Sequence, residues 1–440
     1  MTTNELLKQV RLLDPVSQTD QVVDILITEG RVQTLAETVT DYGSDTKVTD
    51  SQGLVLGPGL VDLYSHSGEP GFEERETIFS LRKAAAAGGF TRVAVLPDTQ
   101  PVMDNLASLT WFHDQQPYQQ ELCHRPSPAL PRLTPWAALT LGCRGEQMTE
   151  LGELTGADIV GFADGKALNN LVLVRRLLEY LRPLGHPIAL WACDEALSRT
   201  GVVRDGLEAL QFGLPGIPAI AETAALAALL ACVEETGATV HLMRLSTARG
   251  VELIRQAKAR QLPITASTTW MHLILDTADL GSYDPNLHLS PPLGNPADRL
   301  ALIQAIQDGT LDAIAIDHSP HTYEDKTVAF AEAPPGAIGL ELALPLLWQG
   351  LVATGQLSAL QLWRALSTGP ALCLQQKPAR LCTRTVDHSV APCLSVEWTL
   401  FDPQATWIAD TTSLQSRSCN TPWLGRSITG RVLQIGCPTE

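Results

Sequence analysis

The chain has 440 residues, with 31 Lys and Arg against 48 Asp and Glu, so its formal net charge at pH 7 is −17. This balance excludes the usual nucleic-acid binders and partners of anionic membranes, which need clustered positive charge. Hydrophobic residues make up 45% of the chain and charged residues 18%, which is typical of a globular protein with a large core and excludes a disordered or coiled-coil chain.

The two ends of the chain share a pattern that the middle lacks. Residues 20–56 alternate apolar and polar side chains around a turn-forming Glu-Gly pair, which predicts short antiparallel strands. Residues 394–435 repeat this alternation. We therefore expect one small β-sandwich built from both termini, with residues 1–57 supplying one part and residues 376–440 the other.

Between these ends, residues 58–375 alternate short apolar strands with amphipathic helices. Eight strands are expected, ending at Tyr64, Pro97, Leu141, Phe162, Ala192, Met243, Ser267 and Asp317. The clearest helical patterns cover 78–88, 171–181, 221–235, 250–259 and 299–309. Apolar strands that alternate with helices are typical of a parallel sheet covered on both faces. Eight such units over about 260 residues predict an α/β fold, a (β/α)8 TIM-type barrel, beside the small β-sandwich.

Residues 114–135 interrupt this alternation. They are rich in Gln and Pro and lack an apolar period, which predicts an exposed connector. In a (β/α)8 barrel the chemistry lies where the strands end, so the residues that follow each strand are the candidates for a site.

Neither membrane insertion nor a disulfide framework is expected. No apolar run approaches the roughly 18 residues that span a bilayer, and Glu5 and Lys8 interrupt the segment where a signal peptide needs its apolar stretch. Nine scattered cysteines without a C-x-x-C pair favour reduced thiols over disulfides or a structural zinc site. The sequence therefore predicts a cytoplasmic protein.

Seven segments within residues 20–437 resemble the dihydroorotase family, cyclic amidohydrolases of pyrimidine biosynthesis. They are GPGLVDLYSHSGEPGFEERETI, AAAAGGFTRVAVLPDTQPVMDN, FGLPGIPAIAE, VHLMRLSTARGVELIRQAKARQLPITAS, LSPPLGNPADR, DAIAIDHSPHTYEDK and GAIGLELALPLL. The resemblance implies interconversion of carbamoyl aspartate and dihydroorotate. In that reaction a hydroxide held between metal ions attacks the amide carbonyl, and an Asp at the last strand carries the proton. The matching residue here is Asp317.

The resemblance also implies that most metal-binding positions of the family have changed. The family's H-x-H pair after the first strand is Tyr64-Ser65-His66, which keeps only His66. The single His of the fifth and of the sixth strand correspond to Trp191 and Arg244. An indole offers only a donor and a guanidinium is permanently positive, so neither binds a divalent cation. Asp164 matches a bridging Asp, but in a segment one residue shorter. We therefore expect no metal at these remnants.

The positions that would hold the substrate carboxylate have changed as well. An Arg two residues beyond the first-strand motif is replaced by Gly68, and an Asn after the second strand by Asp98, whose charge repels an anion. The Asn and Arg of the family's N-P-P-L-R correspond to Ser290 and Gly294. The resemblance therefore implies that the metal site and the substrate site are both lost.

Two replaced side chains allow alternative interpretations. Arg244 is expected to stand in for a metal and neutralise Asp317 and also Asp164, because unpaired carboxylates in a barrel mouth cost free energy. The alternative is that its head group snorkels to solvent. Trp191 is expected to fill the vacated cavity, with a ligand-stacking platform as the alternative.

Cys193, His318 and His321 also lie in or near these motifs. His66 and Asp317, with Cys193, form the set that could hold a single weak metal ion. His318 and His321 are expected to satisfy loop hydrogen bonds.

Two hypotheses about function remain open. The first is a non-catalytic dihydroorotase-like subunit that acts as a structural or regulatory partner in a homo- or hetero-oligomer. The resemblance implies aspartate transcarbamoylase catalytic chains as its partner. The second is an active dihydroorotase, or a cyclic amidohydrolase for a different ring, with a rebuilt site at His66, Asp164 and Asp317 and with zinc as its cofactor.

Overall fold

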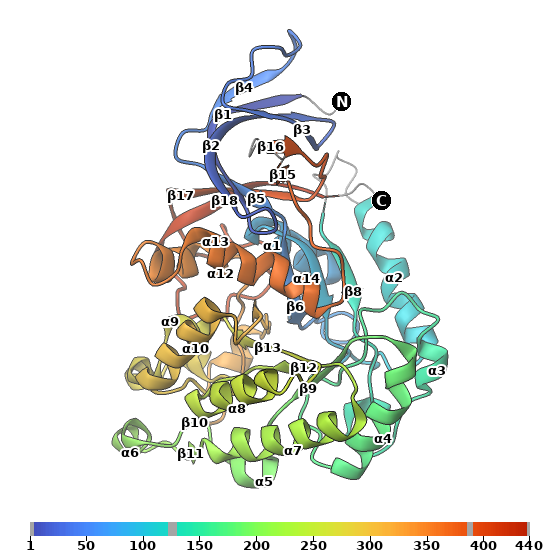
Figure 1. Ribbon diagram of the computed structural model, residues 1–440. Helices are drawn as coiled ribbons and strands as arrows, with labels where there is room; N and C mark the ends of the chain where they lie inside the picture. Colours follow the sequence, from blue (N-terminus) through green and yellow to red (C-terminus); the bar gives the residue numbers. More distant parts are fainter. Residues whose placement is uncertain (1–3, 122–129, 385–389, 438–440) are drawn as a thin grey trace.

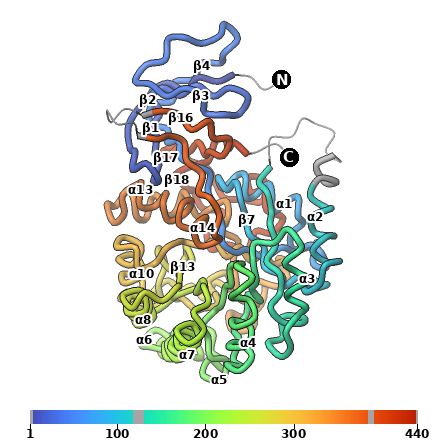
Figure 2. Tube along the Cα trace, turned by 45° about the vertical axis from the view of Figure 1, so that its right-hand side comes forward, coloured from blue at the N-terminus to red at the C-terminus, as the bar shows by residue number. Residues whose placement is uncertain are grey.

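The computed structural model describes residues 4–121, 130–384 and 390–437. Figure 1 shows a β-rich part, which combines the first and last strands of the chain, above a larger part in which helices surround short strands. Figure 2, turned by 45°, shows the same layering, with the blue and the red strands stacked together over the barrel.

The terminal sheet has the strand order β18-β17-β5-β1-β2-β3, and β4 also pairs with β1. Its strands are β1 (Glu5–Asp14), β2 (Thr19–Thr28), β3 (Arg31–Ala36), β4 (Lys47–Asp50), β5 (Val55–Pro58), β17 (Trp398–Ile408) and β18 (Ser427–Gly436). The antiparallel pairing predicted for residues 20–56 is confirmed for β2 and β3. It is wrong for β4, which runs parallel to β1. Strand β5 is parallel to β1 on one side and antiparallel to β17 on the other.

A second layer covers this sheet. Strands β15 (Cys382–Arg384) and β16 (Val390–Pro392) pair with each other, and Leu381 and Cys382 share one hydrophobic cluster with β1 and β2. The buried carboxylate of Asp14 accepts the backbone N–H groups of Leu381 and Cys382 at 2.7 and 3.0 Å. The small β-sandwich from both termini is thereby confirmed, while the boundaries at 57/58 and 375/376 stay predictions.

The barrel is assembled from a three-stranded and a four-stranded parallel ladder. Its strands are β6 (Leu60–Ser65), β7 (Phe90–Val95), β8 (Arg132–Pro135), β9 (Ile188–Trp191), β12 (Val240–Met243), β13 (Ile264–Thr269) and β14 (Ala313–Ala315). Isolated bridges from Phe162 to Ala137 and Ile188 fill the fourth position. Two hydrogen bonds connect the first and last strands, from Asp317 N to Tyr64 O (3.1 Å) and from His66 N to His318 O (2.8 Å). The predicted barrel is confirmed.

Three local predictions are wrong. The third strand is β8 and does not end at Leu141, and the fourth strand is reduced to the bridges of Phe162. Residues 114–135 are no connector, because they contain the end of α2 (Leu106–Glu121) and all of β8, while residues 122–129 lie outside the described residues. A strand of four residues is too short to show a period, so its sequence could not be separated from a loop.

Helices cover the outside of the barrel (Figure 1). They are α1 (Ile78–Gly88), α3 (Leu151–Leu154), α4 (Leu171–Leu181), α5 (Glu195–Ser198), α6 (Leu207–Phe212), α7 (Ile220–Thr236), α8 (Ala248–Ala259), α9 (Met271–Ile274), α10 (Pro296–Asp308), α11 (Tyr323–Lys326), α12 (Ala343–Leu347), α13 (Ala359–Trp363) and α14 (Gly369–Cys373), besides α2. The five longest predicted helices are confirmed to within a few residues. Side-chain caps fix their starts: Asn170 accepts the N–H of Leu173, and Thr247 that of Gly250.

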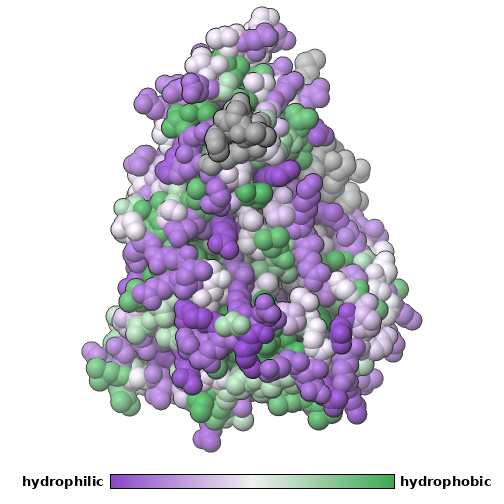
Figure 3. Space-filling view, in the orientation of Figure 1, coloured by the Kyte–Doolittle hydropathy of each residue, from purple (hydrophilic) through white to green (hydrophobic). Residues whose placement is uncertain are grey.

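Hydrophilic residues cover most of the face shown in Figure 3, with apolar residues scattered among them. Within the described part of the chain, no helix combines the length and the apolar character that crossing a bilayer requires.

Candidate functional site

A cavity of about 190 Å³ opens at the ends of the barrel strands, where chemistry is expected in this fold. Among the predicted site residues, its lining includes His66, Asp98, Trp191, Arg244, Ser290 and Asp317. Tyr64, Gly68, Asp164 and Gly294 do not line it. The structure thus brings together only part of the predicted set.

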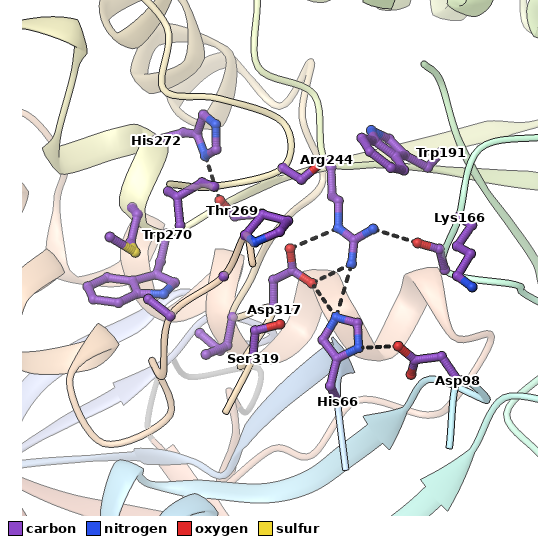
Figure 4. Close-up of a pocket in the computed structure, with 18 residues that line it drawn as sticks. His66, Asp98, Lys166, Trp191, Arg244, Thr269, Trp270, His272, Asp317 and Ser319 are labelled. Atoms are coloured by element: carbon purple, nitrogen blue, oxygen red, sulfur yellow. Dashed lines mark hydrogen bonds and ion pairs between the residues drawn. The ribbon is translucent and has the colours of Figure 1, made fainter. Parts of the chain in front are cut away.

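The guanidinium of Arg244 and the carboxylate of Asp317 form a bidentate ion pair (Figure 4). Arg244 Nη2 lies 2.6 Å from Asp317 Oδ1, and Nε lies 2.8 Å from Oδ2. Nη1 donates to the carbonyl of Gly165 at 2.7 Å. The Arg244 side chain is only 5% exposed, so the snorkelling alternative is wrong and the expected ion pair with Asp317 is confirmed.

His66 extends this pair into an alternating row of charges. Its Nδ1 donates to Asp98 Oδ2 at 2.7 Å, and its Nε2 lies 3.6 Å from Asp317 Oδ1. Burial by itself lowers the pKa of His66, but the carboxylates of Asp98 and Asp317 outweigh burial and raise the pKa to about 9. Although burial opposes it, the neighbouring cations hold the pKa values of both carboxylates below their usual range. At neutral pH the row Asp98, His66, Asp317 and Arg244 therefore carries two positive and two negative charges.

Asp164 does not join this row, which corrects the expectation that Arg244 neutralises it. Asp164 Oδ1 accepts the backbone N–H groups of Leu139 and Thr140 at 2.7 and 3.0 Å. Its Oδ2 accepts the Thr140 hydroxyl at 2.5 Å. Burial raises the pKa of Asp164, and the hydrogen bonds of Thr140 offset part of that effect. Both oxygens are thus committed to the loop after β8.

Two aromatic rings surround the guanidinium. Arg244 Cζ lies 5.4 Å from the centre of the Tyr64 ring and 5.2 Å from that of Trp191, within the range of cation–π attraction. Tyr64 is fully buried, contacts Ser267 Oγ at 3.0 Å, and accepts the backbone N–H of Arg244. Trp191 packs against the apolar cluster that contains Tyr64. These contacts agree with the expectation that Trp191 fills space beside Arg244.

The replaced substrate positions leave no room for the side chains that they lack. A Cβ atom on Gly68 would lie 2.4 Å from the carbonyl oxygens of Phe72 and Glu76. A Cβ atom on Gly294 would lie 2.6 Å from Asp298 Cβ. Other atoms of the fold already occupy the space beside both glycines. Replacing either glycine alone by a longer residue would therefore create a steric clash.

The residues present do not fit a binuclear metal centre. Within residues 4–121, 130–384 and 390–437, no three His, Cys, Asp or Glu side chains are grouped so that they could hold an ion. Asp317 is engaged by Arg244, and a protonated His66 offers no lone pair. The set with Cys193 is not assembled either, because its Sγ contacts Ser198 Oγ at 3.3 Å and does not line this cavity.

Arg244 and Asp317 both have left-handed backbone conformations, with φ values of 57° and 53°. Such a conformation costs a non-glycine residue about 1–2 kcal/mol, and it persists where the surroundings impose it. Arg244 follows β12 directly and Asp317 lies two residues beyond β14, and at these strand ends the two side chains meet above the barrel.

Sequence reasoning missed some lining residues. Thr269 is the last residue of β13, the seventh strand, and His272 lies in α9 just beyond it. Their side chains contact each other at 2.6 Å. Their place at the end of a strand was the signal that could have found them. Lys166 also lines the cavity.

The two histidines after Asp317 serve their own surroundings, as expected. His318 accepts the N–H of Gly339 at 3.2 Å and faces Glu76 at 3.3 Å. His321 Nε2 contacts the carbonyl of Pro335 at 3.0 Å.

Comparisons with known proteins agree with this fold. The family model described as dihydro-orotase-like matches residues 53–249. A Synechocystis sp. protein named dihydroorotase-like is 42% identical over 97% of this chain and 98% of its own length. A dihydroorotase of Syntrophus aciditrophicus is 36% identical, over 97% and 96%. The structure of L-hydantoinase (dihydropyrimidinase) from Arthrobacter aurescens superposes with a TM-score of 0.79 at 21% identity, covering 99% of this chain and 94% of that one, which shows a shared fold.

Replacing Arg244 should reveal how far Asp317 depends on it. In Arg244→Met the buried carboxylate loses its counter-charge, and we expect a loss of ~3–5 kcal/mol in the free energy of unfolding. In the double variant R244M/D317N the loss should be smaller than the sum of the two single losses. Urea denaturation of all three variants measures this coupling.

Arg255→Met, which breaks an exposed pair with Glu252, is the control and should cost less than about 1 kcal/mol. Additive losses would contradict the ion-pair interpretation.

The raised pKa of His66 predicts a pH-dependent stability. An unfolded histidine titrates near about 6.5, whereas His66 in the folded protein has a pKa of about 9. Its contribution is therefore fully present below pH 6.5 and is lost as the pH rises through 9. The stability difference between wild type and His66→Gln should shrink across this window in urea denaturation. A difference that stays constant from pH 6 to 10 would show that His66 is not protonated in the folded state.

Proposed function

This chain belongs to the dihydroorotase-like family, and we propose that within it the protein is a non-catalytic member. In this proposal it keeps the amidohydrolase barrel but has a degraded metal site, and it serves pyrimidine biosynthesis as a structural or regulatory partner. The bidentate pair between Arg244 and Asp317 is the observation that carries the proposal.

The chemistry of that pair supports a lost activity. A general base must be free to accept a proton, and its pKa must lie near the working pH. Asp317 meets neither condition, because Arg244 binds both its oxygens and holds its pKa well below the usual range. His66 is protonated at neutral pH and cannot replace it as a base. The described cavity therefore contains two carboxylates that are neutralised by neighbouring cations, whereas hydrolysis needs an activated nucleophile.

The alternative is a rebuilt enzyme, either a dihydroorotase or a cyclic amide hydrolase for another ring. The names of the curated relatives favour it, since several are dihydroorotases. Those names follow overall likeness, however, and function depends on the particular residues of a site. Asp164, which this alternative uses, is committed to Leu139 and Thr140.

The partner role is the second part of the proposal. A protein without chemistry of its own can still act through its surface, and the sequence alignment with a dihydroorotase covers 97% of this chain. We propose assembly with aspartate transcarbamoylase catalytic chains in the cytoplasm, which the family resemblance suggests.

Metal content and turnover test the first part. Purified protein should contain zinc well below one ion per chain and should hydrolyse dihydroorotate no faster than the buffer blank. Elemental analysis and an absorbance assay measure the two quantities on the same sample. The Syntrophus aciditrophicus dihydroorotase, prepared identically, is the control. Two zinc ions per chain together with measurable turnover would refute the non-catalytic proposal.

Co-elution tests the partner role. The chain and aspartate transcarbamoylase catalytic chains from the same organism, mixed at moderate salt, should elute from a sizing column as one complex whose mass light scattering gives. The Arthrobacter aurescens hydantoinase, which shares the fold, is the matched control and should elute separately. Separate elution of the two proteins at micromolar concentrations would remove the partner proposal while leaving the question of catalysis untouched.

A further inference from the structure

A second cavity of about 270 Å³ lies beside the first. The two share Trp191, Leu289, Ser290 and Pro335 as a common wall. In the first cavity the four charges of the row from Asp98 to Arg244 pair with one another, beside the exposed Lys166. In the second cavity the charges are not paired in this way, and the difference comes from one side chain, Arg204.

Arg204 is a buried cation without a carboxylate partner. It ends the short strand β10 (Val203–Arg204) and is only 3% exposed. Its Nη2 donates to Ser246 Oγ at 2.7 Å and, at the limit of a hydrogen bond, to the carbonyl of Pro292 at 3.5 Å. Its Nε is buried and has no acceptor among the described residues. Within that part of the chain, no carboxylate lies within ion-pair distance of this guanidinium.

The acidic side chains of the same cavity do not cancel this charge directly. Glu222 lines it, but both its oxygens are already saturated. Oε2 accepts Ser246 N and Oγ at 2.9 and 2.5 Å, and Oε1 accepts Thr247 N and Oγ1 at 3.2 and 2.5 Å. Arg204 reaches Glu222 only through the hydroxyl of Ser246. The other two charges, Glu195 and Arg199, are exposed, of opposite sign, and screened by water.

A guanidinium in this state is suited to an oxyanion. It has five N–H donors in a planar fork that matches the two oxygens of a carboxylate or of a phosphate group. Burying the charge without a partner is costly, and a bound anion removes that cost. The rest of the lining offers a thiol and hydroxyls, from Cys193, Ser198 and Ser290, together with apolar prolines. Such a lining suits a ligand whose remainder, beyond the anionic group, is small and uncharged.

We propose that the second cavity binds a small molecule through its carboxylate or phosphate group, with Arg204 as the principal ligand-binding residue. The site is separate from the row around Arg244 and does not depend on whether the barrel is catalytic. A ligand bound there would contact Trp191 and Ser290, which also line the first cavity, so the site has the position of a regulatory site for the barrel mouth.

Isothermal titration with inorganic phosphate and, separately, with malonate tests the proposal. At least one probe should bind wild-type protein saturably with one site per chain, and Arg204→Gln should weaken that binding at least tenfold. Binding of phosphate alone assigns the phosphate class, and binding of malonate alone assigns the carboxylate class. Arg260→Gln, which removes an exposed arginine paired with Glu234, is the matched control and should bind as wild type does. The absence of saturable binding by either probe at millimolar concentration would overturn the proposal.

Two further variants show which cavity holds the anion. They also test the proposal in the case that Arg204→Gln does not fold. Ser198→Leu narrows the second cavity without touching the guanidinium and should also weaken binding by several-fold. His66→Gln alters only the first cavity and should leave the affinity unchanged. Loss of binding in His66→Gln, with binding retained in Ser198→Leu, would place the anion in the first cavity and refute the proposal.

Discussion

The arrangement of the barrel mouth depends on the need of Asp317 for a positive neighbour. The carboxylate of Asp317, just beyond β14, is mostly buried, with 16% of the side chain exposed, and its backbone is left-handed, so a counter-charge is needed to stabilise it there. In this chain Arg244 supplies that charge from the end of β12, across the mouth. Its guanidinium also contacts the carbonyl of Gly165 and the rings of Tyr64 and Trp191. One cation thereby connects residues from five separate segments of the barrel.

The other substitutions make sense as consequences of that cation. His66 lies between two carboxylates, which outweigh the effect of burial and raise its pKa to about 9. Asp98, which would repel an anionic substrate, is then the partner that a charged imidazole needs. Gly68 and Gly294 lie where loop backbone leaves no space for longer side chains. Because these features support each other, changing any one back to a metal ligand would leave the remaining charges unpaired.

The sequence predicted the architecture and the pairing of Arg244 with Asp317, but not the extension of that pair through His66 to Asp98. The bounds of helices with long amphipathic patterns, such as α4 and α8, were predicted to within a few residues, because periodicity and caps both mark them. The contact between Asp98 and His66 was not predicted, because the two residues are 32 positions apart along the chain and only the fold brings them together. Strand β8 has too few residues to show a period. Arg204 stands in no motif, and its significance lies entirely in burial without a partner.

The two cavities differ in how their charges are paired. In the first, the row from Asp98 to Arg244 pairs two cations with two carboxylates, and the exposed Lys166 adds a further positive charge to the lining. The second keeps a buried charge that no carboxylate engages, and the wall between them includes the indole of Trp191. The same indole lies beside the Arg244 guanidinium and forms part of the surface against which a ligand of Arg204 would lie. One aromatic side chain thereby borders both the ion pair of the first cavity and the cavity proposed to hold an anion.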